Sequence, residues 1–301
     1  MKEYKNIRPS AWAVCLVCVV GLWGCTYQLT DEDWTKNGNV RLLLDWRGRS
    51  HPSQMTYFFY KEDVMRPEIR MGGAEGYAGT LPSGCYRVIA CNTDCRNVTL
   101  EMDRGYDAAI GSVRQVSSLK SSVPVPLAQP ANFYATGTVD IEVGGRTAVV
   151  KELYPANLVK TLELNIQLLS GSNNEMVRPT GLSGRLMGIP SEIHLPSATP
   201  FFDRGAYLTF EPEALPSGGY TSRIGLLGLS DSTSVDLYLT MKMPDGTELT
   251  PFIDLTHEAA DAFRKNNTSW LILDLVVDCD AVGGAQITDT EWKEGAGEVE
   301  N

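Results

Sequence analysis

The sequence predicts an all-β protein of two β-sandwich domains in tandem, preceded by an export signal. Three observations favour this architecture. Short segments in which apolar and polar residues alternate recur between turn residues along most of the chain. Only residues 256–267 have the capping and charge pattern of a helix, which places one short helix in the second domain. The first 24 residues have the basic start and apolar run of a secretory signal.

The signal ends at a cysteine whose context indicates lipidation. An uncharged run from Ala11 to Leu22 is about 12 residues long, whereas a transmembrane helix needs about 20. It ends in Leu22-Trp23-Gly24-Cys25, which resembles the bacterial lipobox, although Trp23 departs from the usual small residue. We expect removal of residues 1–24, acylation of Cys25 and a tether over residues 25–38. The alternative is a conventionally cleaved signal without acylation.

The first domain is expected over residues 39–154. Its clearest strand follows the turn at Leu81-Pro82-Ser83-Gly84, where Pro82 pre-sets the bend and Gly84 relaxes it. Residues 117–130 contain three prolines that disrupt ladder bonding, so they are interpreted as a loop or an extended edge crossing. The predicted strands are residues 40–46, 55–61, 76–81, 85–92, 98–102, 131–134, 138–143 and 148–154.

The second domain is expected over residues 155–292, followed by a tail over 293–301. Residues 158–168 alternate leucine and isoleucine with polar side chains, and only Lys160 breaks the pattern, so one face is buried. Asp245-Gly246 supplies the positive φ of a tight hairpin. The predicted strands are residues 181–187, 206–211, 222–228, 235–241, 247–253 and 269–279, with an edge strand ending at residue 292.

The cysteines allow disulfides but do not assign them. Apart from Cys25, the exported part contains Cys85, Cys91, Cys95 and Cys279. A bridge from Cys91 to Cys95 is the easiest geometrically, and buried free thiols are the alternative. We predict no metal site, because the three histidines are scattered and the exported part contains no CxxC pair.

Composition and motifs give no indication of an enzyme, of a cofactor or of nucleic-acid binding. The formal net charge of −11 would repel phosphate backbones. His51, His194 and His257 lie in predicted turns or at a helix start, with no nucleophile paired to them in the sequence. Residues 72–76 lack the strand, helix and third glycine of a nucleotide-binding loop. No catalytic residues are therefore assigned.

Three segments of the first domain resemble a known family. They are "NVRLLLDW" at residues 39–46, "MTYFFY" at 55–60 and "LPSGCYRVIACNTD" at 81–94, with "DTEW" at 289–292 fitting the end of the second domain. The chain thereby resembles Bacteroidales lipoproteins of unassigned function, which are similar to fimbrillin-like proteins and to minor-fimbrium anchor lipoproteins. The resemblance implies two transthyretin-like sandwiches and a place in or near surface fimbriae.

The resemblance also implies how partners would be bound. Fimbrial relatives lose a first strand by proteolysis after an arginine and accept a strand from a neighbour. Arg47 and Arg49 follow the first strand here, but lipidation of Cys25 argues against processing, because the cut would detach the protein from its anchor. An anchor or accessory role on the outer membrane is therefore the leading expectation, with the lipid and fimbrial subunits as partners. The acidic run at residues 31–33 resembles a surface-export signal.

The alternative function is a glycan-binding surface lipoprotein of a polysaccharide-uptake system. That function would place exposed aromatic rings such as Trp34, Trp46, Trp270 and Trp292 on one face, where sugars could stack. A long apolar groove or an unpaired edge strand would instead favour fimbrial assembly.

Overall fold

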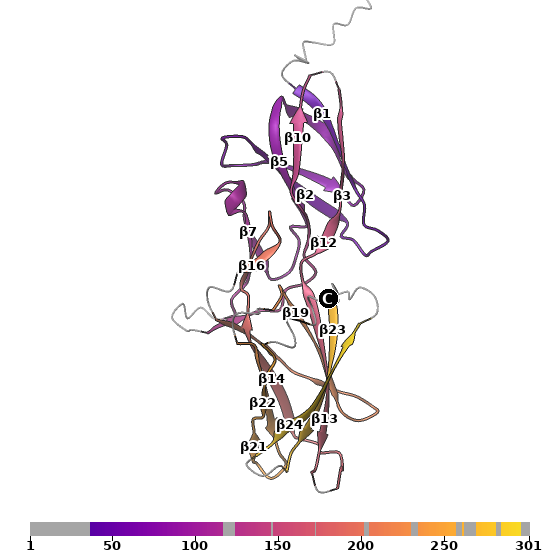
Figure 1. The fold of residues 1–301 in the computed structure, drawn as a ribbon, viewed down its shortest axis with the longest axis vertical. Coiled ribbons are helices and arrows are strands. Elements are labelled where there is room, and N and C mark those ends of the chain that lie inside the picture. Colours follow the sequence, from indigo (N-terminus) through magenta and orange to yellow (C-terminus); the bar gives the residue numbers. More distant parts are fainter. Residues whose placement is uncertain are drawn as a thin grey trace, which may run out of the picture.

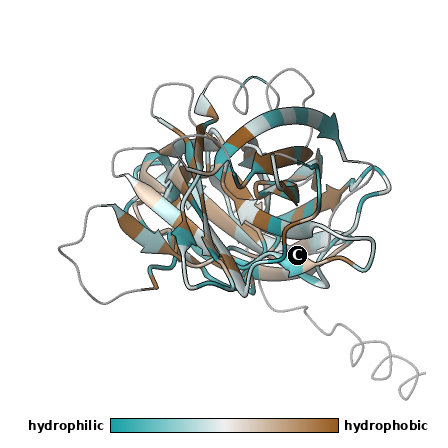
Figure 2. Ribbon diagram, turned by 90° about the horizontal axis from the view of Figure 1, so that it is seen from below, coloured by the Kyte–Doolittle hydropathy of each residue, from teal (hydrophilic) through white to brown (hydrophobic). Residues whose placement is uncertain are grey.

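The computed structural model describes residues 37–116, 124–145, 147–171, 173–201, 205–229, 234–256, 261, 269–280 and 284–295. The described chain is built from strands arranged as sandwiches, with a 3-10 turn at Tyr106–Ala108, which confirms the all-β prediction (Figure 1). Seen along the long axis, many strands alternate hydrophobic and hydrophilic residues (Figure 2). The helix expected over residues 256–267 lies largely outside the described residues. The transthyretin-like assignment of each domain stays a prediction.

The first half of the chain forms a folded-over sheet. Its order is β11-β1-β4-β3-β2-β5-β9-β12, with β10 also paired to β5. Because β3 and β4 are joined only at Gly73 and Gly76, the sheet turns there into two layers. The strands are β1 (Asn37–Leu44), β2 (Gln54–Lys61), β3 (Glu68–Gly73), β4 (Gly76–Pro82), β5 (Gly84–Cys91), β9 (Tyr134–Thr136), β10 (Val139–Val143), β11 (Val149–Leu153) and β12 (Pro155–Asn157).

The alternation in these strands builds a core between the two layers. β1 buries every second residue, Val40, Leu42 and Leu44, against aromatic side chains of β2 and β4. β1 lies between two partners, β4 in antiparallel register and β11 in parallel register. It is therefore a central strand of the layer that it shares with them.

The second half forms a sandwich of two sheets around a larger core. One sheet has the order β18-β19-β13-β23-β24, and the other has the order β21-β20-β14-β17-β8 with β22 on β20. The strands are β8 (Val125–Leu127), β13 (Lys160–Leu169), β14 (Gly181–Ile189), β17 (Ala206–Phe210), β18 (Glu213–Ala214), β19 (Tyr220–Leu226), β20 (Asp236–Lys242), β21 (Glu248–Leu249), β22 (Phe252–Asp254), β23 (Trp270–Asp278) and β24 (Gln286–Glu294).

A third sheet joins the two halves near the middle of the molecule (Figure 1). It contains β6 (Val98–Glu101), β7 (Ile110–Val113), β15 (Glu192–His194) and β16 (Thr199–Phe201), so strands from both halves pair within it. In addition, β8 pairs in parallel with β17, and β12 pairs with β9. Strands that precede residue 155 therefore pair with strands that follow it in several places. The domain boundary expected at residue 155 stays a prediction.

Candidate functional site

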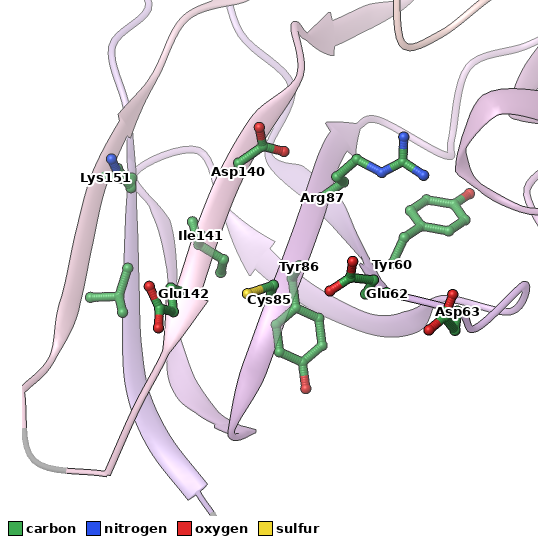
Figure 3. Close-up of a pocket in the computed structure, with 11 residues that line it drawn as sticks. Tyr60, Glu62, Asp63, Cys85, Tyr86, Arg87, Asp140, Ile141, Glu142 and Lys151 are labelled. Atoms are coloured by element: carbon green, nitrogen blue, oxygen red, sulfur yellow. The ribbon is translucent and has the colours of Figure 1, made fainter.

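An open groove runs along β10 in the first sandwich. It has a volume of about 820 Å³. Its walls carry Glu62, Arg87 of β5, Asp140 and Glu142 of β10, and Lys151 of β11 (Figure 3). The alternation of β10 turns Ile141 into the core and leaves the two acidic residues exposed. The groove is thus lined by charged side chains above an apolar base.

The groove exists because β10 and β11 do not pair, although a short connection joins them. In the described sheets, β10 pairs only with β5, and β11 pairs only with β1. Two strand edges with unused backbone donors and acceptors therefore face the groove. Such edges are the places at which an extended chain can be added to a sheet.

The electrostatics of the groove are dominated by carboxylates. Arg87 is already engaged: its Nη1 lies 3.0 Å from Asp107 Oδ1, and its guanidinium carbon lies 4.0 Å from the centroid of the Tyr106 ring. Among the charged residues that line the groove, Lys151 is the other cation, against four acidic side chains. A segment carrying basic residues would match this groove better than an acidic one.

The β2 side of the groove is fixed by a buried hydrogen bond. Tyr60 donates from its hydroxyl to the carbonyl oxygen of Met102 at 2.9 Å. The bond ties the outer face of β2 to the segment that covers it. The Tyr60 ring also meets the Tyr106 ring edge-on at 5.5 Å between centroids. A buried hydrogen bond and an aromatic contact therefore hold this wall of the groove in place.

The two arginines singled out as processing positions lie in an exposed turn after β1. Arg47 has a φ of 53°, its amide donates to Asp45 Oδ1 at 2.8 Å, and its guanidinium carbon lies 4.5 Å from the Tyr154 ring centroid. The Arg49 amide donates to the Trp46 carbonyl oxygen at 3.0 Å. Both side chains are exposed. Cys25 lies outside the described residues, so its acylation stays a prediction.

The four described cysteines differ in exposure. Cys91 and Cys95 are buried in the same core, and burial raises the pKa of each thiol to about 12. The Cys95 thiol donates to the Ala131 carbonyl oxygen at 3.2 Å. Cys279 is buried, with its pKa raised to about 11 mainly by desolvation, whereas Cys85 is exposed in the groove. The Cys91–Cys95 disulfide stays a prediction.

The described tryptophans do not share a face. Trp46 is buried, donates from Nε1 to the Ala74 carbonyl oxygen at 2.7 Å and packs in the first core. Trp270 lies on the outer face of β23 under Arg223, at 5.5 Å from the guanidinium carbon to the ring. Trp292 is the cross-strand partner of the core residue Leu273, so it faces inward. Trp34 lies outside the described residues.

The described residues contain no cluster of three or more histidine, cysteine, aspartate or glutamate side chains able to hold a metal ion. Within the same part of the chain, no helix has the length and apolar character that crossing a membrane requires.

The groove residues could not be identified from the sequence. Asp140, Glu142 and Lys151 resemble ordinary solvent-facing strand residues. Consecutive strands joined by a short turn usually pair with each other, so a groove between them is not expected. Gly144-Gly145, between the strands, marks only a turn.

The chain matches the family model of a domain of unknown function, DUF5119, over residues 24–195. The chain belongs to the DUF5119 family. The DUF5119 match covers the whole first sandwich and continues through β15, which pairs with β7 in the third sheet, the one that joins the two halves. Among curated proteins, none matches the chain.

Several solved structures share the DUF5119 protein's fold. A candidate polysaccharide-binding protein from Bacteroides thetaiotaomicron has a TM-score of 0.60 at 10% identity, covering 84% of this chain and 98% of that chain. A candidate adhesin from Bacteroides ovatus has a TM-score of 0.58 at 15% identity, covering 74% and 84%. The fimbrial anchor protein Mfa2 from Porphyromonas gingivalis has a TM-score of 0.56 at 10% identity, covering 86% and 97%. The family and these folds confirm the resemblance inferred from the sequence.

Proposed function

We propose that this DUF5119 protein is a lipid-anchored, non-enzymatic component of the outer-membrane surface that anchors fimbriae or assists their assembly. Its fold is similar to that of the fimbrial anchor Mfa2 and of a candidate adhesin. The observation that carries the proposal is the open groove between the unpaired edges of β10 and β11. The lipid on Cys25 would hold the protein at the membrane, and the groove would receive a fimbrial subunit.

The binding step is the addition of an extended segment from the fimbrial subunit along β10. Backbone hydrogen bonds to β10 supply the affinity, and the side chains of the groove select the segment. β10 has five residues, which at about 3.4 Å per residue gives a contact about 17 Å long. A short extended segment whose basic residues face Asp140 and Glu142 would both pair with the backbone of β10 and match the charge of the groove.

We further propose that the chain keeps β1 and is not processed at Arg47 or Arg49. Loss of β1 would remove Val40, Leu42 and Leu44 from the core. Full burial of such a side chain stabilises by about 1.5–3 kcal/mol, so the three together contribute about 5–9 kcal/mol. That is comparable with the whole stability of a domain, about 5–15 kcal/mol. A cut in this turn would destabilise the sandwich unless another strand replaced β1.

The positions of the tryptophans favour fimbrial assembly over the polysaccharide-uptake role. Sugar capture by stacked indole rings requires the rings to lie together on one exposed face. Trp46 lies in the first core, and Trp270 and Trp292 lie on opposite faces of their sheet. The open strand edges are the feature that the assembly role requires.

Cys85 provides a direct test of this function. Its thiol is exposed in the groove while the other described cysteines are buried, so a maleimide carrying a photo-crosslinker labels this position in intact cells. After illumination we expect a covalent adduct with a fimbrial subunit, identified by mass spectrometry.

The control moves the label away from the groove. Cys85→Ser combined with Glu248→Cys places it on β21, at the opposite end of the molecule (Figure 1), and should not yield the fimbrial adduct. Adducts with a sugar transporter from Cys85, or equal fimbrial adducts from both positions, would refute the proposal.

A further inference from the structure

A stacked arginine lies on the outer face of the second sandwich, well away from the groove. Arg185 projects from β14 between two tyrosine rings. Its guanidinium carbon lies 5.2 Å from the Tyr238 ring centroid and 5.7 Å from the Tyr207 ring centroid. Tyr238 in turn stacks on Phe252, with 5.6 Å between centroids and 22° between ring planes. Four side chains from four neighbouring strands thus form a continuous stack, the Arg185 ladder, in the order Tyr207, Arg185, Tyr238 and Phe252.

The ladder holds the guanidinium in place but leaves its hydrogen-bond donors unused. Within the described ranges, Arg185 makes only the two ring contacts, with no ion pair and no hydrogen bond. Arg223, on the other sheet, provides a contrast. It also lies over an aromatic ring, that of Trp270, but its Nε donates to Glu163 Oε2 at 2.8 Å. Arg223 is therefore paired with a carboxylate of the protein, whereas Arg185 has no such partner in the described chain.

Hydroxyl groups surround Arg185 on the same face. Thr209 is its cross-strand partner on β17, and Ser183 with its own partner Thr240 lies one step along the strands. These three hydroxyls make no hydrogen bond with any described residue. Together with Arg185 and Tyr238 they line a hollow of about 570 Å³. That volume is within the range of about 300–1,000 Å³ typical of small-molecule sites.

On the core side of the same sheet, Gly184 packs closely against Phe210. A Cβ atom on Gly184 would lie 2.0 Å from the Phe210 ring, so the ring occupies space that any other residue would need. Phe210 also lines the hollow. On the outer face, Arg185 and the hydroxyls lie beside the Tyr238 ring, and polar groups next to an aromatic ring suit ring-shaped polar ligands.

The carboxylates on this face do not pair with Arg185. Asp236 accepts a hydrogen bond from Ser234 at 2.9 Å, and Asp254 accepts one from the Thr256 amide at 2.8 Å. Glu211 lines the hollow without forming an ion pair to Arg185 within the described chain. Arg185 is thus a local positive centre whose planar fork can bind a carboxylate through two parallel hydrogen bonds.

We infer that this hollow binds a carboxylate-bearing saccharide, with Arg185 on the carboxylate and Ser183, Thr209 and Thr240 on sugar hydroxyls. A peptide fits less well. β14 pairs with a strand on each side, so its backbone offers nothing to an extended chain, and only side chains face the ligand. The inference goes beyond the proposed fimbrial role and does not depend on it.

The test measures the affinity of the full-length protein in detergent for tri-galacturonic acid by calorimetry. We expect binding by the wild type and no comparable binding of the fully methyl-esterified trimer, which has the same shape without the charges. Loss of the bidentate contact in Arg185→Gln should weaken binding about 10- to 100-fold. Arg185→Lys keeps the charge but not the planar fork, so its affinity for the trimer should lie between that of the wild type and that of Arg185→Gln.

Arg223→Gln is the matched control, because it removes a stacked arginine that is already paired. It should bind the trimer as the wild type does, and near-UV circular dichroism should show the same fold for every variant. The inference is overturned by failure of the wild type to bind, by equal binding of the methyl ester, or by equal affinity of Arg185→Gln. Arg185-dependent binding of an acidic peptide in place of the saccharide would also overturn it.

Discussion

Two buried tyrosines on β2 should respond in opposite directions to the same substitution. Tyr57 points into the first core, where its hydroxyl is fully buried and has no hydrogen-bond partner in the described chain. Tyr60 points to the other face and donates to the Met102 carbonyl oxygen at 2.9 Å. Replacing either by phenylalanine removes one oxygen and leaves the ring in place. Tyr57→Phe should therefore stabilise the protein, and Tyr60→Phe should destabilise it.

The magnitudes follow from the two environments. A buried polar group without a partner costs about 1–3 kcal/mol, so Tyr57→Phe should raise the free energy of unfolding by about 1 kcal/mol or more. A typical hydrogen bond contributes about 0.5–1.5 kcal/mol, and Tyr60→Phe also leaves the Met102 carbonyl oxygen without this donor. The two variants should thus differ by about 2 kcal/mol. Urea denaturation of the mature protein measures this difference as a shift in midpoint at constant m-value.

The pH dependence supplies a second measurement. Burial raises the pKa of Tyr57 above its usual value of 10.0. Above pH 10 the unfolded chain releases this proton while the folded protein keeps it, so stability falls as the pH rises. Tyr57→Phe should lose less stability than the wild type between pH 9 and pH 11. The reasoning is refuted if Tyr57→Phe destabilises the protein as much as Tyr60→Phe does, because the Tyr57 hydroxyl would then have a partner.

Three further outcomes are expected. Cys25→Ala should move the protein out of the membrane fraction and abolish labelling by a fatty-acid probe; an unlabelled protein that stays in the membrane would contradict the anchor. Gly184→Ala should lower the free energy of unfolding by about 1–3 kcal/mol, because its Cβ would meet the Phe210 ring. Thermal melts measure this loss. Gly144→Ala is the control and should be neutral, because a Cβ at that position has nothing within 4 Å. A maleimide should modify only Cys85 among the described cysteines of the folded protein, and the number of thiols released by unfolding without reductant distinguishes free thiols from a Cys91–Cys95 bridge.

The alternation of apolar and polar residues was enough to predict most long strands. Predicted residues 158–168 correspond to β13, 269–279 to β23, and 85–92 to β5. β3 was missed, because Ile69 and Met71 are exposed and the strand has no buried stripe. β8 lies in the proline-rich segment, where pairing with β17 on one side suffices for an edge strand.

The candidate sites were harder to predict because they depend on pairings that alternation does not encode. The groove requires that β10 and β11, neighbours in the sequence, pair with different partners. The Arg185 ladder requires the register of four strands, in which Tyr238 is opposite both Arg185 and Phe252. Neither register can be derived from a single strand, since the period of two fixes the face of a side chain but not its neighbour.

The parallel pairing of β1 with β11 determines how this molecule would bear tension. A pull from the amino-terminal side enters at the start of β1, and the chain leaves β11 at its carboxyl end, toward β12 and the second sandwich. Because the two strands run the same way, opposite pulls at those ends slide them past each other. All five residue pairs, from Val40 with Val149 to Leu44 with Leu153, are then strained at once instead of being peeled apart one after another. A pull between these two ends is thus resisted by the whole ladder at once, which is the mechanical property that the proposed anchor role would require.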